Sequence, residues 1–366
     1  SGEWKMCTIG ELTTKVGSGV TPRGGEAVYK TEGHPFVRSQ NVGLGNLLLD
    51  DIAFIDEETH LRQKNTELQF NDVLLNITGA SIGRSALVDK QIVGGNVNQH
   101  VCIIRTKENL VPSFICSFLL SNYGQRQIDS FQAGGNRQGL NFEQIKSIKI
   151  TIPSKDEQIK IAKLLRAIDE RIAIQNKIID KLQSLIKGLR VCCMQRNGSD
   201  NVYLSEIAQI YQPQTISSAE LTEDGFLVYG ANGIIGKYKD YNHKTEQICI
   251  TCRGNTCGMV NYTKPMSWIT GNAMVINTDK YQDKVYKKYL YHYLSAYNFN
   301  SIISGSGQPQ IVRTPLEKLK ITLPTISEQK QKAMILDKIQ DKIEINHNVL
   351  NLYILQKQYL LRQMFI

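Results

Sequence analysis

One helix start occurs twice in this chain of 366 residues, and this repeat limits the folds open to it. Residues 152–165 read IPSKDEQIKIAKLL, and residues 323–336 read LPTISEQKQKAMIL. The matched pairs are Pro153 and Pro324, Glu157 and Glu328, Gln158 and Gln329, Ala162 and Ala333, and Leu165 and Leu336, all at the offset 324 − 153 = 171. Self-similarity at a fixed offset marks an internal repeat, so we predict two copies of one structural plan.

The repeat extends upstream of the helix starts. IKSIKITIP at 145–153 aligns with LEKLKITLP at 316–324, and IGELTTKV at 9–16 resembles LSEIAQIY at 204–211. The last pair has the offset 204 − 9 = 195, so the first copy is longer by insertions. Each copy is predicted to be a mixed α/β globule followed by a long helix. The predicted parts are a first head at 1–153, a first helix at 154–197, a second head at 198–324 and a second helix at 325–366.

Both long segments carry a heptad pattern, which predicts helix-on-helix packing. The seam of the first contains Ile161, Leu165, Ile168, Ile172, Ile179, Leu182, Ile186 and Leu189, with one polar gap at Gln175. The seam of the second contains Leu336, Ile339, Ile343, Leu350, Tyr353, Leu360 and Met364, with its gap at Asn346. A helix of about 40 residues is roughly 60 Å long, more than a small globule covers. Ser154 and Ser327 are the candidate N-caps, and Glu157 has the capping-box spacing from Ser154.

The two heads show the same order of short elements. Strand–turn–strand patterns are predicted at 72–88 and 246–262, further strands at 99–106 and 272–278, and helices at 111–128 and 286–299. Gly79 and Gly83 in the first turn match Gly254 and Gly258 in the second. We therefore expect the same turn geometry in both heads.

The charge balance favours a polyanionic partner. The formal net charge is +9 and the pI is about 9.0, which is compatible with nucleic acid but does not require it. No run approaches the roughly 18 apolar residues of a membrane span. The start of the chain shows no apolar signal-peptide core, so its eight cysteines are expected to be reduced thiols in a cytosol.

Motifs that carry catalysis are missing from the sequence. It contains no G-x-x-x-x-G-K-[ST] phosphate loop, no Rossmann fingerprint between strand and helix, no Asn-Pro-Pro-aromatic tetrapeptide and no H-x-x-x-H pair. Cys249, Cys252 and Cys257 have a spacing that hints at zinc. Their partners in the first head are the apolar Leu74, Ile77 and Ile82, so buried thiols are the preferred interpretation and no metal is predicted.

Polar residues concentrate in the turns of both heads. Arg, Asn, Gln and Ser side chains read base edges and hold phosphates, although solvated loops have similar compositions. The candidate DNA-binding residues are Arg38, Ser39, Gln40, Asn41, Arg84, Asn136, Arg137 and Gln138 in the first head, and Lys237, Arg253, Asn255, Gln308, Gln310 and Arg313 in the second.

The doubled Pro-x-x-x-Glu-Gln helix start and the order head, helix, head, helix resemble the specificity subunit of type I restriction–modification systems. The segments HPFVRSQNVG and NITGASIGRSALV in the first head, and VYGANGIIGKYKDYN and WITGNAMVINT in the second, are similar to its target-recognition domains. The second copy departs from the family pattern, with Lys332-Ala333 where the first has Ile161-Ala162.

This resemblance implies an α+β fold in which two α/β target-recognition domains are separated and followed by long helices that pair as an antiparallel coiled coil, with a pseudo-twofold internal repeat. It implies a non-catalytic chain that reads a bipartite double-stranded DNA site and directs methyltransferase and restriction/translocase subunits to it. Those partners would bind S-adenosylmethionine, ATP and Mg; this chain would bind no cofactor. The expected compartment is a bacterial or archaeal cytoplasm, without membrane attachment.

Three other interpretations remain at this point. The chain could be the specificity chain of a related system with fused methyltransferase and nuclease, or a non-catalytic coiled-coil scaffold whose heads bind protein. A stand-alone nuclease would need clustered carboxylates, which the sequence does not show. If the helices pair antiparallel, Gln175 and Asn346 are expected at about the same level, where they would set the register of the coiled coil.

Overall fold

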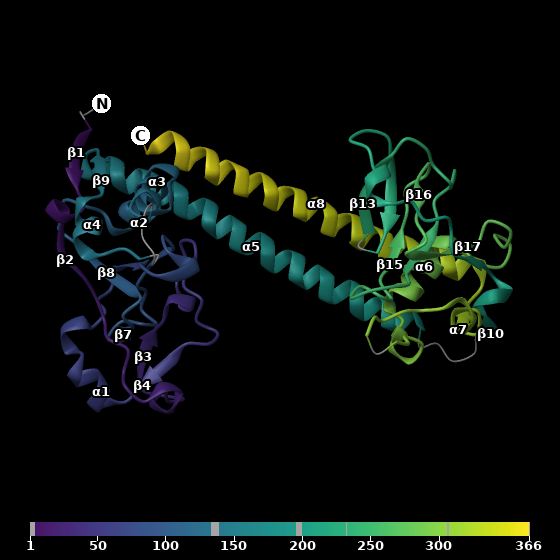
Figure 1. The fold of residues 1–366 in the computed structure, drawn as a ribbon, viewed down its shortest axis with the longest axis horizontal. Helices are drawn as coiled ribbons and strands as arrows, with labels where there is room; N and C mark the ends of the chain where they lie inside the picture. Colours follow the sequence, from purple (N-terminus) through teal and green to yellow (C-terminus); the bar gives the residue numbers. More distant parts are fainter. Residues whose placement is uncertain (1–3, 133–138, 195–199, 232, 306, 366) are drawn as a thin grey trace. The chain divides into compact units, whose positions relative to one another are not determined.

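The computed structural model describes residues 4–132, 139–194, 200–231, 233–305 and 307–365 (Figure 1). It contains two compact units, one formed by residues 1–175 and 349–366 and the other by residues 176–348. Each unit therefore holds one head and part of both long helices. Within the described residues, no helix is long and apolar enough to span a membrane.

The described residues of the first head form three small sheets and four short helices. Its four-stranded antiparallel sheet has the order β2-β8-β5-β6, with bounds Thr13–Ser18, Val101–Thr106, Val73–Asn76 and Ser85–Leu87. The three-stranded sheet has the order β4-β3-β7, with bounds Ala53–Ile55, His34–Val37 and Asn96–Val97. Strands β1 (Lys5–Thr8) and β9 (Lys149–Ile152) pair antiparallel. The helices are α1 Glu57–Arg62, α2 Pro112–Leu120, α3 Asn122–Ser130 and α4 Phe142–Ser147.

The second head repeats this arrangement sheet by sheet. Its four-stranded antiparallel sheet has the order β11-β17-β14-β15, with bounds Gln209–Tyr211, Ala273–Asn277, Ile248–Thr251 and Val260–Tyr262. The three-stranded sheet is β13-β12-β16, with bounds Gly233–Tyr238, Phe226–Gly230 and Trp268–Ile269. Strands β10 (Asp200–Tyr203) and β18 (Lys320–Leu323) pair antiparallel, and the helices are α6 Lys287–Ala296 and α7 Arg313–Glu317.

Short 3₁₀ turns connect these elements. They are η1 Gly10–Leu12, η2 Gly25–Val28, η3 Ser39–Asn41, η4 Lys64–Thr66, η5 Gly79–Ser81, η6 Leu204–Glu206, η7 Ser218–Glu220 and η8 Phe299–Ser301.

The shared sheet order and strand directions confirm the predicted internal repeat. In both heads the central strand of the three-stranded sheet is antiparallel to one neighbour and parallel to the other. Most of the extra length of the first head lies before the β5–β6 turn, since the offset falls from 195 at residue 9 to 254 − 79 = 175 at Gly79. Residues 38–52 connect β3 to β4, whereas β12 ends at Gly230 and β13 begins at Gly233. Helix α1 and turn η4 form a second insertion of the first head.

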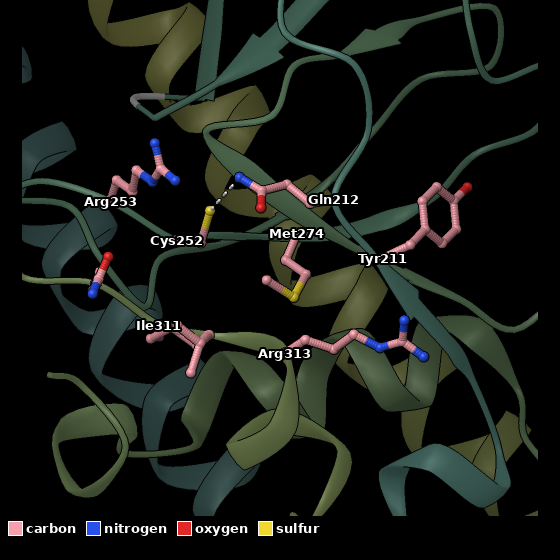
Figure 2. Close-up of a pocket in the computed structure, with 9 residues that line it drawn as sticks. Tyr211, Gln212, Cys252, Arg253, Met274, Ile311 and Arg313 are labelled. Carbon is pink, nitrogen blue, oxygen red and sulfur yellow. Dashed lines mark hydrogen bonds between the residues drawn. The ribbon is translucent and has the colours of Figure 1, made fainter.

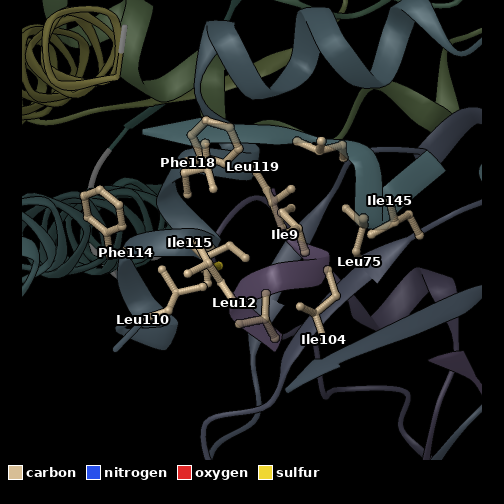
Figure 3. Packing of buried hydrophobic residues seen from close by; sticks show 14 of the residues in the cluster. Ile9, Leu12, Leu75, Ile104, Leu110, Phe114, Ile115, Phe118, Leu119 and Ile145 are labelled. Carbon is tan, nitrogen blue, oxygen red and sulfur yellow. The ribbon is translucent and has the colours of Figure 1, made fainter. Parts of the chain in front are cut away.

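Each head has its own hydrophobic core, between the four-stranded sheet and the helices that follow it. Figure 3 shows part of the first core, where Leu75 and Ile104 from the sheet pack with Phe114 and Phe118 of α2. In the second core Ile250 and Ile276 take the sheet positions, and Tyr289, Leu290 and Leu316 come from α6 and α7. Burial of these apolar side chains is the main force that stabilises each head.

The helix predicted at 111–128 is wrong in its extent, because it is two helices. Helix α2 ends at Leu120, and Ser121 begins α3 by accepting a hydrogen bond from the Gly124 N–H (3.2 Å). The Ser121 hydroxyl also donates to the Phe118 carbonyl (2.6 Å). A serine at this position favours a helix boundary because its side chain competes with the backbone for hydrogen bonds.

The long helices are α5 (Lys155–Met194) and α8 (Ile326–Met364). The cap predicted at Ser154 is present, since its hydroxyl accepts from the Glu157 N–H at 3.4 Å. The cap predicted at Ser327 is wrong, since Ser327 lies inside α8. Thr325 is the cap: its hydroxyl accepts from the Glu328 N–H, and Glu328 accepts from the Thr325 N–H (3.1 Å). This is the reciprocal capping box, at the position that matches Ser154.

The repeated glutamine joins each long helix to its head. Gln158 accepts from the Val111 N–H (2.9 Å) and donates to the carbonyls of Asn109 and Pro153 (both 3.1 Å). Gln329 accepts from the Tyr286 N–H (2.8 Å) and donates to the carbonyls of Lys284 (3.1 Å) and Pro324 (2.8 Å). We call each set a glutamine latch. All its partners are backbone groups, so the latch does not depend on which side chains the head carries.

Within the first unit, the start of α5 packs against the end of α8. Ile161 and Leu165 share a core cluster with Leu361 and Phe365, and Phe365 also lies 5.2 Å from Phe114, centroid to centroid. Further along, Lys357 pairs with Asp169 (2.5 Å). Contacts between the start of one helix and the end of the other define an antiparallel pair.

Within the second unit, the late part of α5 packs against the early part of α8. Ile186, Leu336 and Ile343 form the buried centre of this contact, with Leu182, Leu189 and Ile339 around it. These are positions of the predicted seams, and this contact too is antiparallel. Gln175 of the first unit and Asn346 of the second are each 8% exposed. Both gap residues are thus turned away from solvent, as the heptad phase predicts, and Asn346 donates to the Lys342 carbonyl (2.6 Å).

Candidate nucleic-acid interface

The loop 38–52 of the first head carries four predicted site residues, and they have different roles. Asn41 is fully buried, so its prediction as a DNA-facing side chain is corrected here. It accepts from the Arg38 N–H (2.9 Å) and donates to the Leu48 carbonyl (2.9 Å) and to Asp51 (3.0 Å). An amide with all these partners buried inside a loop holds the loop's shape.

Arg38 and Gln40 both contact Asp51. Arg38 donates to the Asp51 carbonyl (2.8 Å), lies 3.6 Å from the Asp51 carboxylate and sits over the Tyr29 ring at 5.4 Å. Gln40 is exposed and donates to the same carboxylate. The Ser39 carbonyl accepts from Asn76 (2.8 Å), which ties the loop to the end of β5. Of the predicted residues in this loop, Gln40 is exposed and Arg38 is partly exposed, so both are within reach of a ligand.

Arg84 lies in the turn between β5 and β6, and its side chain is exposed. The turn needs glycine at two places, since Gly79 (φ +70°) and Gly83 (φ +83°) have left-handed backbone that disfavours other residues. Gly254 (φ +84°) and Gly258 (φ +93°) repeat the geometry in the second head. The predicted match of the two turns is confirmed. The remaining first-head predictions, Asn136, Arg137 and Gln138, lie outside the described residues.

The second head brings three of its predicted residues to one pocket. Arg253, Gln310 and Arg313 line a pocket of about 360 Å³, together with Tyr211, Gln212, Cys252, Met274, Ile311 and Val312 (Figure 2). Cys252, Met274 and Ile311 are buried and form its apolar floor. Arg253 and Gln310 are exposed at its rim, where they form an isolated antiparallel bridge. A concave site in which polar side chains converge over an apolar floor has the character of a recognition site.

Tyr211 and Gln212 are pocket residues that sequence reasoning missed. Gln212 donates to the Gly271 carbonyl and to the Cys252 sulfur (3.9 Å). The Tyr211 hydroxyl is hydrogen-bonded to His243 (2.8 Å), and burial raises the pKa of Tyr211. Tyr211 is the last residue of the repeated segment LSEIAQIY and Gln212 follows it, but nothing in the sequence placed either one beside Arg253.

The other second-head predictions do not converge on this pocket. Asn255 and Gln308 are exposed in separate turns. Lys237 on β13 lies 3.5 Å from Asp224. Arg313 lines the pocket but pairs with Glu317 at 2.6 Å, one turn along α7. An exposed pair of this kind contributes little stability, so Arg313 remains available to a phosphate.

The three closely spaced cysteines do not form a common site. Cys249 belongs to one buried cluster and Cys252 to another, on the two faces of β14. Burial raises the pKa of Cys249 to about 12, and also raises the pKa of Cys252. Zinc binds the thiolate, which burial disfavours here. Within the described ranges, no group of His, Cys, Asp and Glu could hold a metal ion.

The end of the central strand has the same backbone frame in both heads. In the first head the Ile77 N–H donates to the His100 carbonyl (3.0 Å), and the Leu140 N–H donates to the Ile77 carbonyl (2.9 Å). In the second, the Cys252 N–H donates to the Asn272 carbonyl and the Ile311 N–H to the Cys252 carbonyl (both 3.0 Å). The next residue forms a bridge in each case, Thr78 with Gly139 and Arg253 with Gln310. We call this position the strand-end site.

Comparison with known proteins identifies a family for both halves of the chain. The family described as Type I restriction modification DNA specificity domain matches residues 1–184 and again residues 197–352. A chain of Methanocaldococcus jannaschii, named as the specificity subunit of the type I restriction enzyme MjaX, is 22% identical over 94% of this chain and 88% of its own length. The EcoprrI specificity subunit of Escherichia coli is 32% identical, over 37% of this chain and 34% of its own length.

Solved structures show the same fold. The S subunit of a type I restriction–modification system from M. genitalium superposes with a TM-score of 0.69 at 16% identity, covering 100% of this chain and 97% of that one. A chain from a structure of type I R-M complex assembly and conformational transition gives 0.59 at 17% identity, covering 98% of this chain and 96% of that one. The family match spans both heads and most of both helices, and the internal repeat follows the same division. This chain belongs to the type I restriction modification DNA specificity family.

Proposed function

We propose that this chain reads a bipartite double-stranded DNA site, one half with each head, and directs methyltransferase and restriction/translocase subunits to it. The observation that carries the proposal is the complete duplication of the head. The two copies share one backbone arrangement, but their exposed polar side chains differ. Two such heads on one chain suit two half-sites of different sequence. Arg38, Gln40 and Arg84 in the first head, and Arg253, Gln310 and Arg313 in the second, are the proposed DNA-facing residues.

Catalysis in the proposed complex belongs to the partners. S-adenosylmethionine would be bound by the methyltransferase subunits, and ATP and Mg by the subunits that add restriction. The chain itself is a specificity subunit, a class that is non-catalytic in this family. Host DNA and these partners share the cytoplasm of a bacterium or archaeon, and we propose that the chain acts there.

A fused methyltransferase–nuclease partner is the second possibility, since the same specificity chain would suit either arrangement. The identity of the neighbouring gene separates the two. A scaffold whose heads bind protein is disfavoured by the family match to both heads.

A DNA mobility-shift assay tests the proposal. We expect the chain together with its methyltransferase subunit to shift duplexes that carry both half-sites, with affinity that falls as salt rises because phosphate contacts release counterions. Duplexes with either half scrambled should bind more weakly. Equal binding of all duplexes, with and without the methyltransferase subunit, would contradict the proposal.

Gln175 and Asn346 offer a prediction about the spacing of the half-sites. We propose that the two buried amides set the register of the helix pair, because a slip by one heptad would leave buried polar groups without suitable partners. Replacing both by Leu should raise the melting temperature and broaden the set of spacer lengths that the complex methylates. Melting curves and a spacer-length series of DNA substrates measure the two effects. Unchanged stability together with one unchanged spacer length would refute the register role.

A further inference from the structure

We infer that base identity is read at the strand-end site of each head, and that Arg253 of the second head reads a guanine there. The inference rests on the proposed function and names its specificity-determining residues. It starts from a comparison that the duplication makes possible. The two heads share one backbone arrangement, so comparing equivalent positions shows which side chains that arrangement requires and which can vary.

The buried members of the strand-end site keep their character between the heads. Ile77 corresponds to Cys252 and Leu140 to Ile311, and all of them are at most 5% exposed. Their backbone groups make the same hydrogen bonds in both heads. These residues therefore support the frame, as buried positions generally do.

The outward members differ in chemistry. Thr78, His100 and Gly139 in the first head correspond to Arg253, Asn272 and Gln310 in the second. The first set contains a hydrogen-bonded pair, since the Thr78 hydroxyl and His100 Nδ1 are 2.6 Å apart. The second set presents one guanidinium and two amides. Two heads that recognise different base sequences require different hydrogen-bond donors and acceptors on the same backbone arrangement.

Of the three predicted cations of the second head, Arg253 is the best placed for direct base reading. Lys237 lies beside Asp224 and Arg313 pairs with Glu317, whereas no ion pair between described residues includes Arg253. Its guanidinium extends from the rim of the pocket, beside Cys252 and Gln212 (Figure 2). An unpaired arginine fork fits the O6 and N7 acceptors of guanine in the major groove, while an amide such as that of Gln310 fits adenine.

The pocket floor adds a reason for a base rather than a phosphate at this site. Cys252, Met274 and Ile311 are nearly fully buried and apolar, and desolvating a charged phosphate over such a surface would cost more than placing a neutral base there. Among the described residues, the strand-end site of the first head contains no arginine. Its half-site is therefore expected to lack an arginine-read guanine at the corresponding position.

The test uses the full chain in complex with its methyltransferase subunit and a library of duplexes randomised across both half-sites. The variants are Arg253→Ala, Arg253→Lys and the double exchange Arg253→Thr with Gln310→Gly, which installs the first head's residues. Lys280→Ala is the matched control. Lys280 is exposed and follows the opposite end of β17, so it loses the same charge away from the site. Melting curves establish that each variant is folded.

We expect Arg253→Ala to lose preference for guanine at one position, by about 5- to 150-fold, the range for one bidentate contact. The Lys variant should bind the library nearly as well with reduced preference, and Lys280→Ala should keep the wild-type profile. Unchanged base preference in Arg253→Ala, or an equal loss at every position and sequence, would overturn the inference. Failure of the proposed function would appear separately, as a wild-type complex with no preference for two separated half-sites.

Discussion

Replacing Gln329 by Ala is expected to destabilise the second unit by about 2 to 4 kcal/mol. The change removes the hydrogen bonds to the Tyr286 N–H and to the carbonyls of Lys284 and Pro324. Gln329 is only 1% exposed, so water cannot readily replace these bonds, and each buried group left unmade costs about 1 kcal/mol or more. For a unit of this size the melting temperature should fall by roughly 4 to 16 °C.

Gln331→Ala is the control for this measurement. Gln331 lies two residues further along α8 and is exposed, so its replacement changes helix propensity equally without touching the latch. Gln158→Ala repeats the test in the first unit, where the bonds and the exposure are the same. If Gln329→Ala melted like Gln331→Ala, the latch would not be what joins the helix to the head.

Grafting residues 13–106 from another family member is expected to change one half of the recognised motif and leave the other half unaltered. This segment contains loop 38–52, Arg84, Thr78 and His100. Its ends lie side by side, because Thr13 pairs with Thr106 across β2 and β8. The graft leaves α2 in place, and with it the contacts of Phe114 and Phe118 with Phe365 of α8.

The glutamine latch makes such an exchange structurally tolerable. Gln158 holds backbone groups at Asn109 and Val111, outside the grafted segment. Sequencing of methylated DNA from cells that express each chimera with the methyltransferase subunit reads out the motif. Grafting 13–106 of the wild-type chain onto itself with silent junction changes is the matched control. A change in both halves would show that the heads do not read independently.

The repeat and both helical seams were predictable from this sequence, because each is periodic. Leu165, Ile168 and Ile186 are buried as the heptad phase requires, and a periodic apolar pattern is the strongest local signal of structure. The two halves also served as an alignment of two sequences. The equivalence of Gly79 and Gly254 came from that comparison, and the backbone angles agree with it.

The sequence predictions were wrong or incomplete where tertiary contacts determine burial and local structure. Asn41 has a side chain of the kind that contacts base edges, but it is buried because loop 38–52 folds back on it through Leu48 and Asp51. Ser121 ends one helix and begins another within a run that is helical by propensity. Thr325 was passed over as a cap in favour of Ser327, although the 171-residue offset from Ser154 pointed to it. Gln212 carries no local signal, since only the folded sheet brings it to Arg253 and Gln310.

The most direct measurement is the methylation motif of the unaltered complex. The chain and its methyltransferase subunit would be expressed in a host without modification enzymes, and the modified adenines located by single-molecule sequencing. The account predicts one motif with two specified halves of different sequence, separated by a fixed number of unspecified base pairs. A continuous motif, or the same half-site sequence twice, would contradict the claim that two distinct heads each read one half.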